Sequence, residues 1–267
     1  MEAQALEKII ALAHAGQIGN PGTDVPTMLV PTGYALESLE KYQETPSRFR
    51  GAFKTSSIDD YAAYVNAEST ARVFVDTDDM DAEAFFDLGT TGSAGHGEHR
   101  ALLKLQRTAP YTACLQAHDS AFGQKELAHF IEDWHAHITG ESTSGNELTA
   151  KQLANMVRRI EVKATAERTH EEGDWNTKRS GLDALDASAG EDTPAFIRFA
   201  CLPYEGLSLR TFDLRVSILT DDNKPRIKLR ITGLEGIQEE VAKEFKAVLG
   251  EHLGDHATLL LGNFRKG

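Results

Sequence analysis

Apolar and polar residues alternate most regularly near the C-terminus of the chain. Every second residue is apolar from Phe212 to Ile218, and a strict alternation returns from Arg226 to Ile231. The residues between the two segments, Asp221-Asp222-Asn223-Lys224-Pro225, are typical of a turn. Because side chains alternate between the two faces of a strand, this pattern predicts an antiparallel hairpin with one buried face.

Other short segments also have the alternation or the apolar content of strands. The alternation is clearest over 99–107, which predicts a strand covered on one face. We expect residues 109–118 to return beside it, after a loop at Pro110. Further strands are expected at 28–30, 72–76, 85–88 and 259–264.

Five segments repeat apolar residues at the helical spacing of i, i+3, i+4 and i+7. The first covers the first fifteen residues, and two others begin with capping sequences at Ser57 and at Thr149. The remaining two are expected at 125–138 and at 237–249, the last ended by the glycine that follows it.

Residues 139–149 lie between two of these helices and are rich in Gly, Ser and Thr, so we expect a mobile loop there. Antiparallel hairpins packed with amphipathic helices, without a regular alternation of strand and helix, predict an α+β fold. We expect a single domain over residues 1–267, because the polar loop is too short for a domain linker and the sequence has no internal repeat.

The composition favours a cytoplasmic protein. No apolar run approaches the roughly 20 residues that cross a bilayer. Glu2 and Glu7 stand where a secretory signal would have basic residues, so no signal peptide and no membrane association are expected. Cys114 and Cys201 belong to no Cys/His cluster and lie among apolar residues, which predicts buried thiols in a reducing compartment.

The formal net charge of −13 is unevenly distributed. Residues 1–150 carry 10 Lys and Arg against 22 Asp and Glu, a net charge of −12, whereas residues 151–267 carry 18 against 19, a net charge of −1. Direct binding to nucleic acid is therefore not expected for the chain as a whole.

Candidate catalytic groups are few. The sequence has no GxSxG, no HExxH and no phosphate-binding loop, and the acidic run 76–83 lacks the glycine of a calcium loop. His96 and His99 leave two alternatives open: ligands of a metal in a hydrolase, or locally hydrogen-bonded histidines. We expect no stoichiometric metal and no cofactor.

Arg226, Lys228 and Arg230 project from one face of the expected C-terminal hairpin, because strand side chains repeat every two residues. Two interpretations stay open. The face is an ordinary solvated surface, or it is a basic ridge that meets an acidic group on another subunit or on a small anionic ligand such as a nucleotide.

Several motifs occur together in the order of one known family. They are PSRFRG (46–51), YAAYVN (61–66), ARVFVD (71–76), GH with EHR (95–100), FIEDW (130–134), HEEGD (170–174), PYEG (203–206) and the strand 210–219. In these motifs the chain resembles the YfdQ-like phage and prophage family, domain of unknown function 2303, along nearly its whole length. The resemblance implies a phage-associated cytoplasmic protein, and it brings no catalytic residues with it.

Three functional hypotheses follow. The first is a non-enzymatic phage accessory protein that forms a homo-oligomer, with the basic hairpin of one subunit facing the acidic N-terminal part of another, and with a host or phage protein as a further partner. The second is a metal-dependent hydrolase that uses His96 and His99. The third is a binder of small anionic ligands at the hairpin face.

Overall fold

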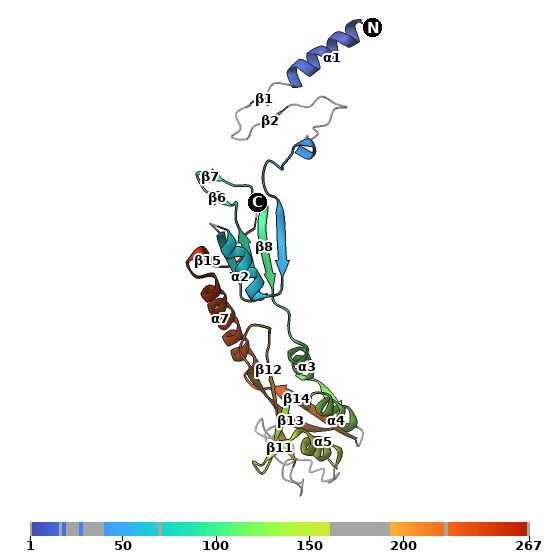
Figure 1. The fold of residues 1–267 in the computed structure, drawn as a ribbon. Helices are drawn as coiled ribbons and strands as arrows, with labels where there is room; N and C mark the ends of the chain where they lie inside the picture. The colour runs from blue at the N-terminus through green and yellow to red at the C-terminus, as the bar shows by residue number, and fades with distance from the viewer. Residues whose placement is uncertain are drawn as a thin grey trace, which may run out of the picture. The chain divides into compact units, whose positions relative to one another are not determined.

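The computed structural model describes residues 2–15, 18–19, 27–28, 40–68, 71–160, 193–221 and 224–265. The chain forms two compact units, residues 1–50 and residues 51–267 (Figure 1). The first unit holds α1 (Glu2–Ala15), the paired strands β1 (Ile18–Gly19) and β2 (Thr27–Met28), and the short helix η1 (Glu40–Tyr42). The predicted N-terminal helix is confirmed, whereas most of the strand expected at 28–30 lies outside the described residues.

The second unit contains a five-stranded sheet in the order β15-β4-β5-β8-β3. Its strands are β3 (Gly51–Thr55), β4 (Ala71–Asp76), β5 (Asp81–Phe85), β8 (His99–Lys104) and β15 (Ala257–Leu261). The three central strands are antiparallel, but both edge strands pair in parallel, β15 with β4 and β3 with β8. The strand expected at 85–88 is wrong in its bounds: β5 covers Asp81–Phe85, residues 86–88 belong to no strand, and a small hairpin of β6 (Gly89–Thr90) and β7 (Ser93–Ala94) follows.

Helix α2 (Ile58–Ala67) packs on this sheet as its sequence predicts. The Ser57 side chain caps the helix by accepting a hydrogen bond from the Asp60 backbone N–H at 3.1 Å. The apolar residues of the predicted stripe are all buried: Ile58, Tyr61, Ala62 and Val65.

A second, fully antiparallel sheet has six strands in the order β11-β10-β12-β13-β14-β9. They are β9 (Ala121–Gly123), β10 (Ile138–Ser142), β11 (Glu147–Thr149), β12 (Pro194–Cys201), β13 (Arg210–Asp221) and β14 (Lys224–Ile231). The predicted C-terminal hairpin is confirmed as β13–β14, with Leu214 opposite Ile231 and Ile218 opposite Ile227. One face of the sheet is buried under α3 (Ala109–Ala117), α4 (Gln124–Asp133) and α5 (Ala150–Arg158). The α+β prediction holds for the chain.

Two predicted segments have a different structure. Residues 109–117 form helix α3 instead of a returning strand, because Thr108 caps a helix and Pro110 stands in its first turn, where a missing N–H costs no hydrogen bond. Residues 138–149 form the hairpin β10–β11 instead of a loop, and β10 pairs with β12. Helix α4 accordingly ends at Asp133, before the 138 expected from the sequence.

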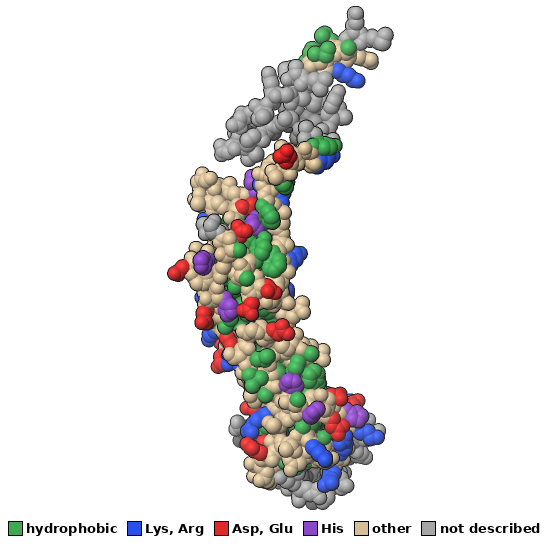
Figure 2. All heavy atoms as spheres, viewed as in Figure 1, with side chains coloured by type: hydrophobic (Ala, Val, Ile, Leu, Met, Phe, Trp, Pro, Cys, Tyr) green, Lys and Arg blue, Asp and Glu red, His purple; other side chains and the backbone are tan. Residues whose placement is uncertain are grey.

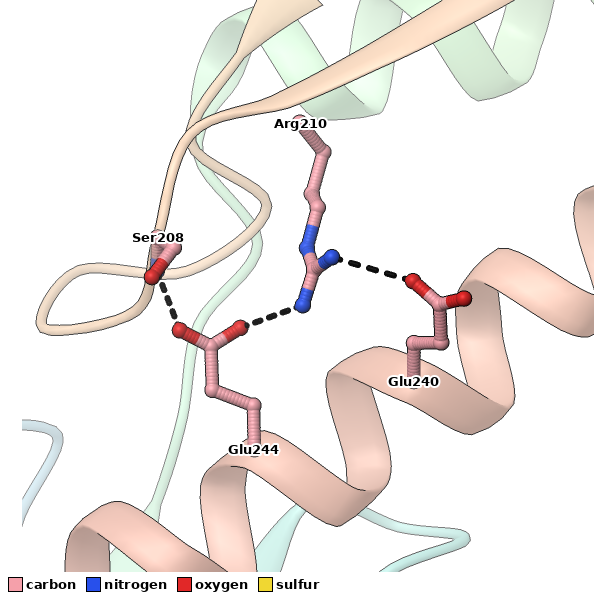
Figure 3. Close-up of polar contacts among 4 residues, drawn as sticks. All are labelled: Ser208, Arg210, Glu240 and Glu244. Atoms are coloured by element: carbon pink, nitrogen blue, oxygen red, sulfur yellow. Dashed lines mark hydrogen bonds and ion pairs between the residues drawn. The ribbon is translucent and has the colours of Figure 1, made fainter.

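The long helix α7 (Leu234–Leu253) is tied to the start of β13 by charged side chains (Figure 3). Arg210 donates to Glu240 at 3.0 Å and to Glu244 at 2.8 Å, and Glu244 also accepts from the Ser208 backbone N–H at 2.7 Å. The helix continues through Gly250, where the sequence predicted its end, and stops at Gly254, whose φ of +53° is a conformation that favours glycine. Buried Leu249 and Leu253 on either side of Gly250 offset its weak helix propensity.

Candidate functional site

The six-stranded sheet has one face without buried side chains on its central strands, opposite the face that the helices cover. Five basic side chains, exposed or half-buried, lie on it, and we call this surface the basic face. Its members are Arg198 on β12, Arg215 on β13, and Arg226, Lys228 and Arg230 on β14. In the view of Figure 2, Lys and Arg side chains, with some Asp and Glu side chains among them, lie over the region of α4 and α5, and Asp and Glu side chains are spread over α2 and α7.

Sequence reasoning selected the three residues of β14 but missed Arg198 and Arg215. The same period of two places Arg215 on the outer face of its own strand, so alternation could have identified it. The pairing register adds what alternation cannot show: Arg215 lies directly opposite Arg230.

Some of these charges are compensated by acidic neighbours. Lys228 lies 3.1 Å from Asp119 and holds the pKa of that carboxyl below its ordinary value. Arg198 forms ion pairs with Glu141 and, at 3.6 Å, with Asp213.

Three arginines of the basic face form no ion pair with a described residue, although the charge of Arg230 also acts on Asp119. Within the described part of the chain, no ion pair joins Arg215, Arg226 or Arg230 to an acidic side chain. Like charges directly opposite each other destabilise a sheet, so the Arg215–Arg230 pair costs stability that an external anionic group would relieve.

The two candidate metal ligands are placed differently from each other. His96 is exposed in the loop before β8, whereas His99 is buried at the start of β8 with its Nε2 3.0 Å from the Tyr64 hydroxyl oxygen. The His99 ring also packs on Phe86, with 4.4 Å between the ring centroids. Among the residues described, no group of three or more His, Cys, Asp or Glu side chains could hold a metal ion, so this geometry gives the hydrolase hypothesis no support.

A small pocket of about 180 Å³ lies between the start of α2, the end of α7 and the loop at Glu205. His252 lines it, with Nε2 3.1 Å from an Asp59 carboxylate oxygen and Nδ1 2.8 Å from the Val248 carbonyl oxygen. Two carboxylates, Asp59 and Glu205, line the same pocket. Their charge disfavours a small anion there, so the pocket does not suit a nucleotide phosphate.

The two cysteines are buried and free. Burial raises the pKa of Cys114 to about 12 and that of Cys201 to about 11. Because the thiolate is the reactive form, neither is suited to act as a nucleophile at neutral pH.

None of the helices in the described ranges has the length and apolar content required to cross a membrane.

Comparison with known proteins adds one relationship. The family model described as "Uncharacterized conserved protein (DUF2303)" matches residues 1–264. No curated protein and no solved structure matches the chain. The match covers nearly the whole length, and the chain therefore belongs to the DUF2303 family.

Proposed function

We propose that this protein is a non-enzymatic accessory protein that acts as a homo-oligomer, in which the basic face of one copy docks on an acidic surface of another. The observation that carries the proposal is a set of three arginines, Arg215, Arg226 and Arg230, that form no ion pair among the described residues and lie on one open sheet face of a chain with net charge −13. The motifs that resemble the YfdQ-like family support a phage or prophage origin and a place in the host cytoplasm.

The shape and composition of the basic face favour a macromolecular partner over a small ligand. An open antiparallel sheet presents its side chains as a surface, whereas small ligands are usually held in concave pockets. Exposed ion pairs contribute only about 0–1 kcal/mol each, so apolar contacts must supply most of the affinity. Leu219, which is 40% exposed, and the half-buried Phe196 lie on the same face and offer such contacts.

The test is the size of the purified particle at low and at high salt, measured by light scattering. We expect an oligomer whose dissociation constant rises with salt, because screening weakens exposed charge pairs. The triple variant Arg226→Glu, Lys228→Glu, Arg230→Glu should shift the equilibrium toward monomer at every salt concentration. A monomeric wild type, or an oligomer indifferent to the triple variant, would overturn the proposal.

A control variant distinguishes the effect of charge reversal on the basic face from the effect of a changed net charge. Lys54, Lys151 and Lys246 are exposed and lie outside the basic face. Replacing all three with Glu changes the net charge by the same amount and should leave the assembly intact. Circular dichroism of both variants checks that the subunit remains folded.

The two other hypotheses have their own readouts. If the basic face binds small anions, nucleotides will raise the melting temperature of the wild type and not that of the triple variant. If His96 and His99 serve a hydrolase, elemental analysis after dialysis will find about one metal ion per chain. We expect neither result.

A further inference from the structure

We infer that the segment received by the basic face is the β4–β5 turn of a second copy of the chain. This inference rests on the proposed function, and it specifies which acidic surface of the second copy contacts the basic face. The turn concentrates carboxylates at one end of the five-stranded sheet, and we call it the acidic turn. Its acidic members are Asp76, Asp78, Asp79 and Asp81.

The acidic turn is held in shape by its own hydrogen bonds. One carboxylate oxygen of Asp76 accepts from the backbone N–H groups of Asp78 at 2.9 Å and of Asp79 at 3.2 Å. Met80, which completes the turn, is buried and has a φ of +52°. The side chains of Asp78 and Asp79 are exposed, so the turn presents two carboxylates outward from an ordered backbone.

The fold acts differently on the charges of two carboxylates at the ends of the turn, Asp81 and Asp76. Burial, together with the charges of Asp76 and Asp79, raises the pKa of Asp81, although Lys104 at 3.7 Å opposes this shift. In contrast, hydrogen bonds from Asn263 and from backbone N–H groups hold the pKa of Asp76 below its ordinary value, so the turn keeps this carboxylate charged. A contact between two copies would relieve the repulsion between Arg215 and Arg230, which each isolated subunit retains.

Several other acidic groups of the second unit are engaged within the subunit. Asp59 lies beside His252, and it also stands in the first turn of α2, where the helix dipole favours a carboxylate. Glu240 and Glu244 are held by Arg210. In the described residues, no ion pair engages Asp78 or Asp79, so the acidic turn keeps two neighbouring, exposed carboxylates available to pair with a second copy.

The resulting contact joins two different surfaces, because the basic face and the acidic turn belong to different sheets. Such a heterologous contact generates a ring if the rotation between copies closes and an open chain of subunits if it does not.

Charge exchange between two variants tests the contact. The face variant carries Arg215→Glu and Arg230→Glu, and the turn variant carries Asp78→Lys and Asp79→Lys. Each variant alone should self-associate at least about tenfold more weakly than the wild type, since attraction becomes repulsion at two pairs. An equimolar mixture should regain the assembly, because the reversed face fits the reversed turn. A chain with all four substitutions should self-associate like the wild type.

The outcomes separate this inference from the proposed function. If the face variant dissociates but the turn variant assembles normally, the basic face binds some other part of the second copy, and the inference fails while the proposed function stands. A mixture that stays dissociated also overturns the inference. A monomeric wild type overturns both.

Two further variants complete the experiment. Asp133→Lys with Asp255→Lys changes the net charge as the turn variant does, at exposed positions elsewhere, and should assemble normally. If the turn variant unfolds, Asp78→Asn with Asp79→Asn keeps the turn geometry, and it should still weaken the assembly.

Discussion

Gly140 lies on β10 at a point where a larger side chain would crowd Leu153. A Cβ atom built at this position would come within 2.9 Å of Cδ1 and 3.1 Å of Cδ2 of Leu153, a residue of α5 that is fully buried. The glycine therefore allows the strand to approach the helix closely, which is one of the recurrent uses of glycine inside a strand.

We predict that Gly140→Val lowers the free energy of unfolding by about 1–3 kcal/mol, because the added methyl groups overpack the contact with Leu153. Denaturant unfolding measures the change. Thr139→Val, on the exposed side of the same strand, is the matched control and should change stability by less than about 0.5 kcal/mol. Equal effects at the two positions would show that the close approach of β10 to α5 is not what the glycine serves.

A second prediction at the scale of single residues concerns the reactivity of the two thiols. Because burial raises the pKa of Cys114 to about 12 and of Cys201 to about 11, both stay protonated at pH 8 and inaccessible in the folded chain. A thiol reagent such as DTNB should react with neither in the native protein and with both after unfolding in guanidinium. Rapid reaction of one thiol without denaturant would contradict the buried placement.

At the scale of elements, the ion pairs of Arg210 join β13 to α7 (Figure 3). Burial alone would raise the pKa of Glu244, but hydrogen bonds from Ser208 and the charge of Arg210 hold it below its ordinary value. A carboxyl whose pKa is lower in the folded state stabilises the fold above its ordinary pKa of 4.5, and this contribution is lost as the pH falls through the folded value.

We therefore predict that Glu244→Gln lowers the free energy of unfolding by about 1–2 kcal/mol at pH 7, since it keeps the shape of the side chain but removes a charge-assisted hydrogen bond. The difference between variant and wild type should shrink as the pH falls below 4.5. Urea unfolding at pH 7, 5 and 3.5 provides the comparison. Glu239→Gln, on the same helix and with only a distant partner, Lys243 at 3.9 Å, should show no such difference. A pH-independent loss would mean that packing, not charge, explains the effect of Glu244→Gln.

At the scale of the whole molecule, the distribution of charge matters more for the proposed self-association than the net charge does. A chain with net charge −13 should repel copies of itself, yet one sheet face carries three arginines that form no ion pair in the described residues. Salt should therefore have two opposite effects on assembly. It favours assembly by screening the long-range repulsion between negatively charged subunits, and it disfavours assembly by weakening the ion pairs at the contact. The proposed contact requires the second effect to dominate.

The sequence by itself determined the elements whose signals are local. Alternation over 212–231 was sufficient for the hairpin β13–β14, and a serine cap followed by a helical stripe was sufficient for α2 and its four buried residues. Such patterns succeed because one buried face imposes its period on a single continuous segment. The class of fold follows from the same patterns, and so does the face of β14 to which its three basic residues belong.

Only the tertiary structure decided the features that depend on distant pairing. The sequence of residues 139–149 predicts a loop, but β10 pairs with β12, whose residues lie more than fifty positions away. Pairing with a distant strand leaves no local signal in the sequence. Likewise α7 continues through Gly250 because Leu249 and Leu253 are buried against the core, and that burial outweighs the propensity of one glycine. Arg215 faces Arg230 for the same reason: each position can be read from its own strand, but only the register between strands brings the two charges together.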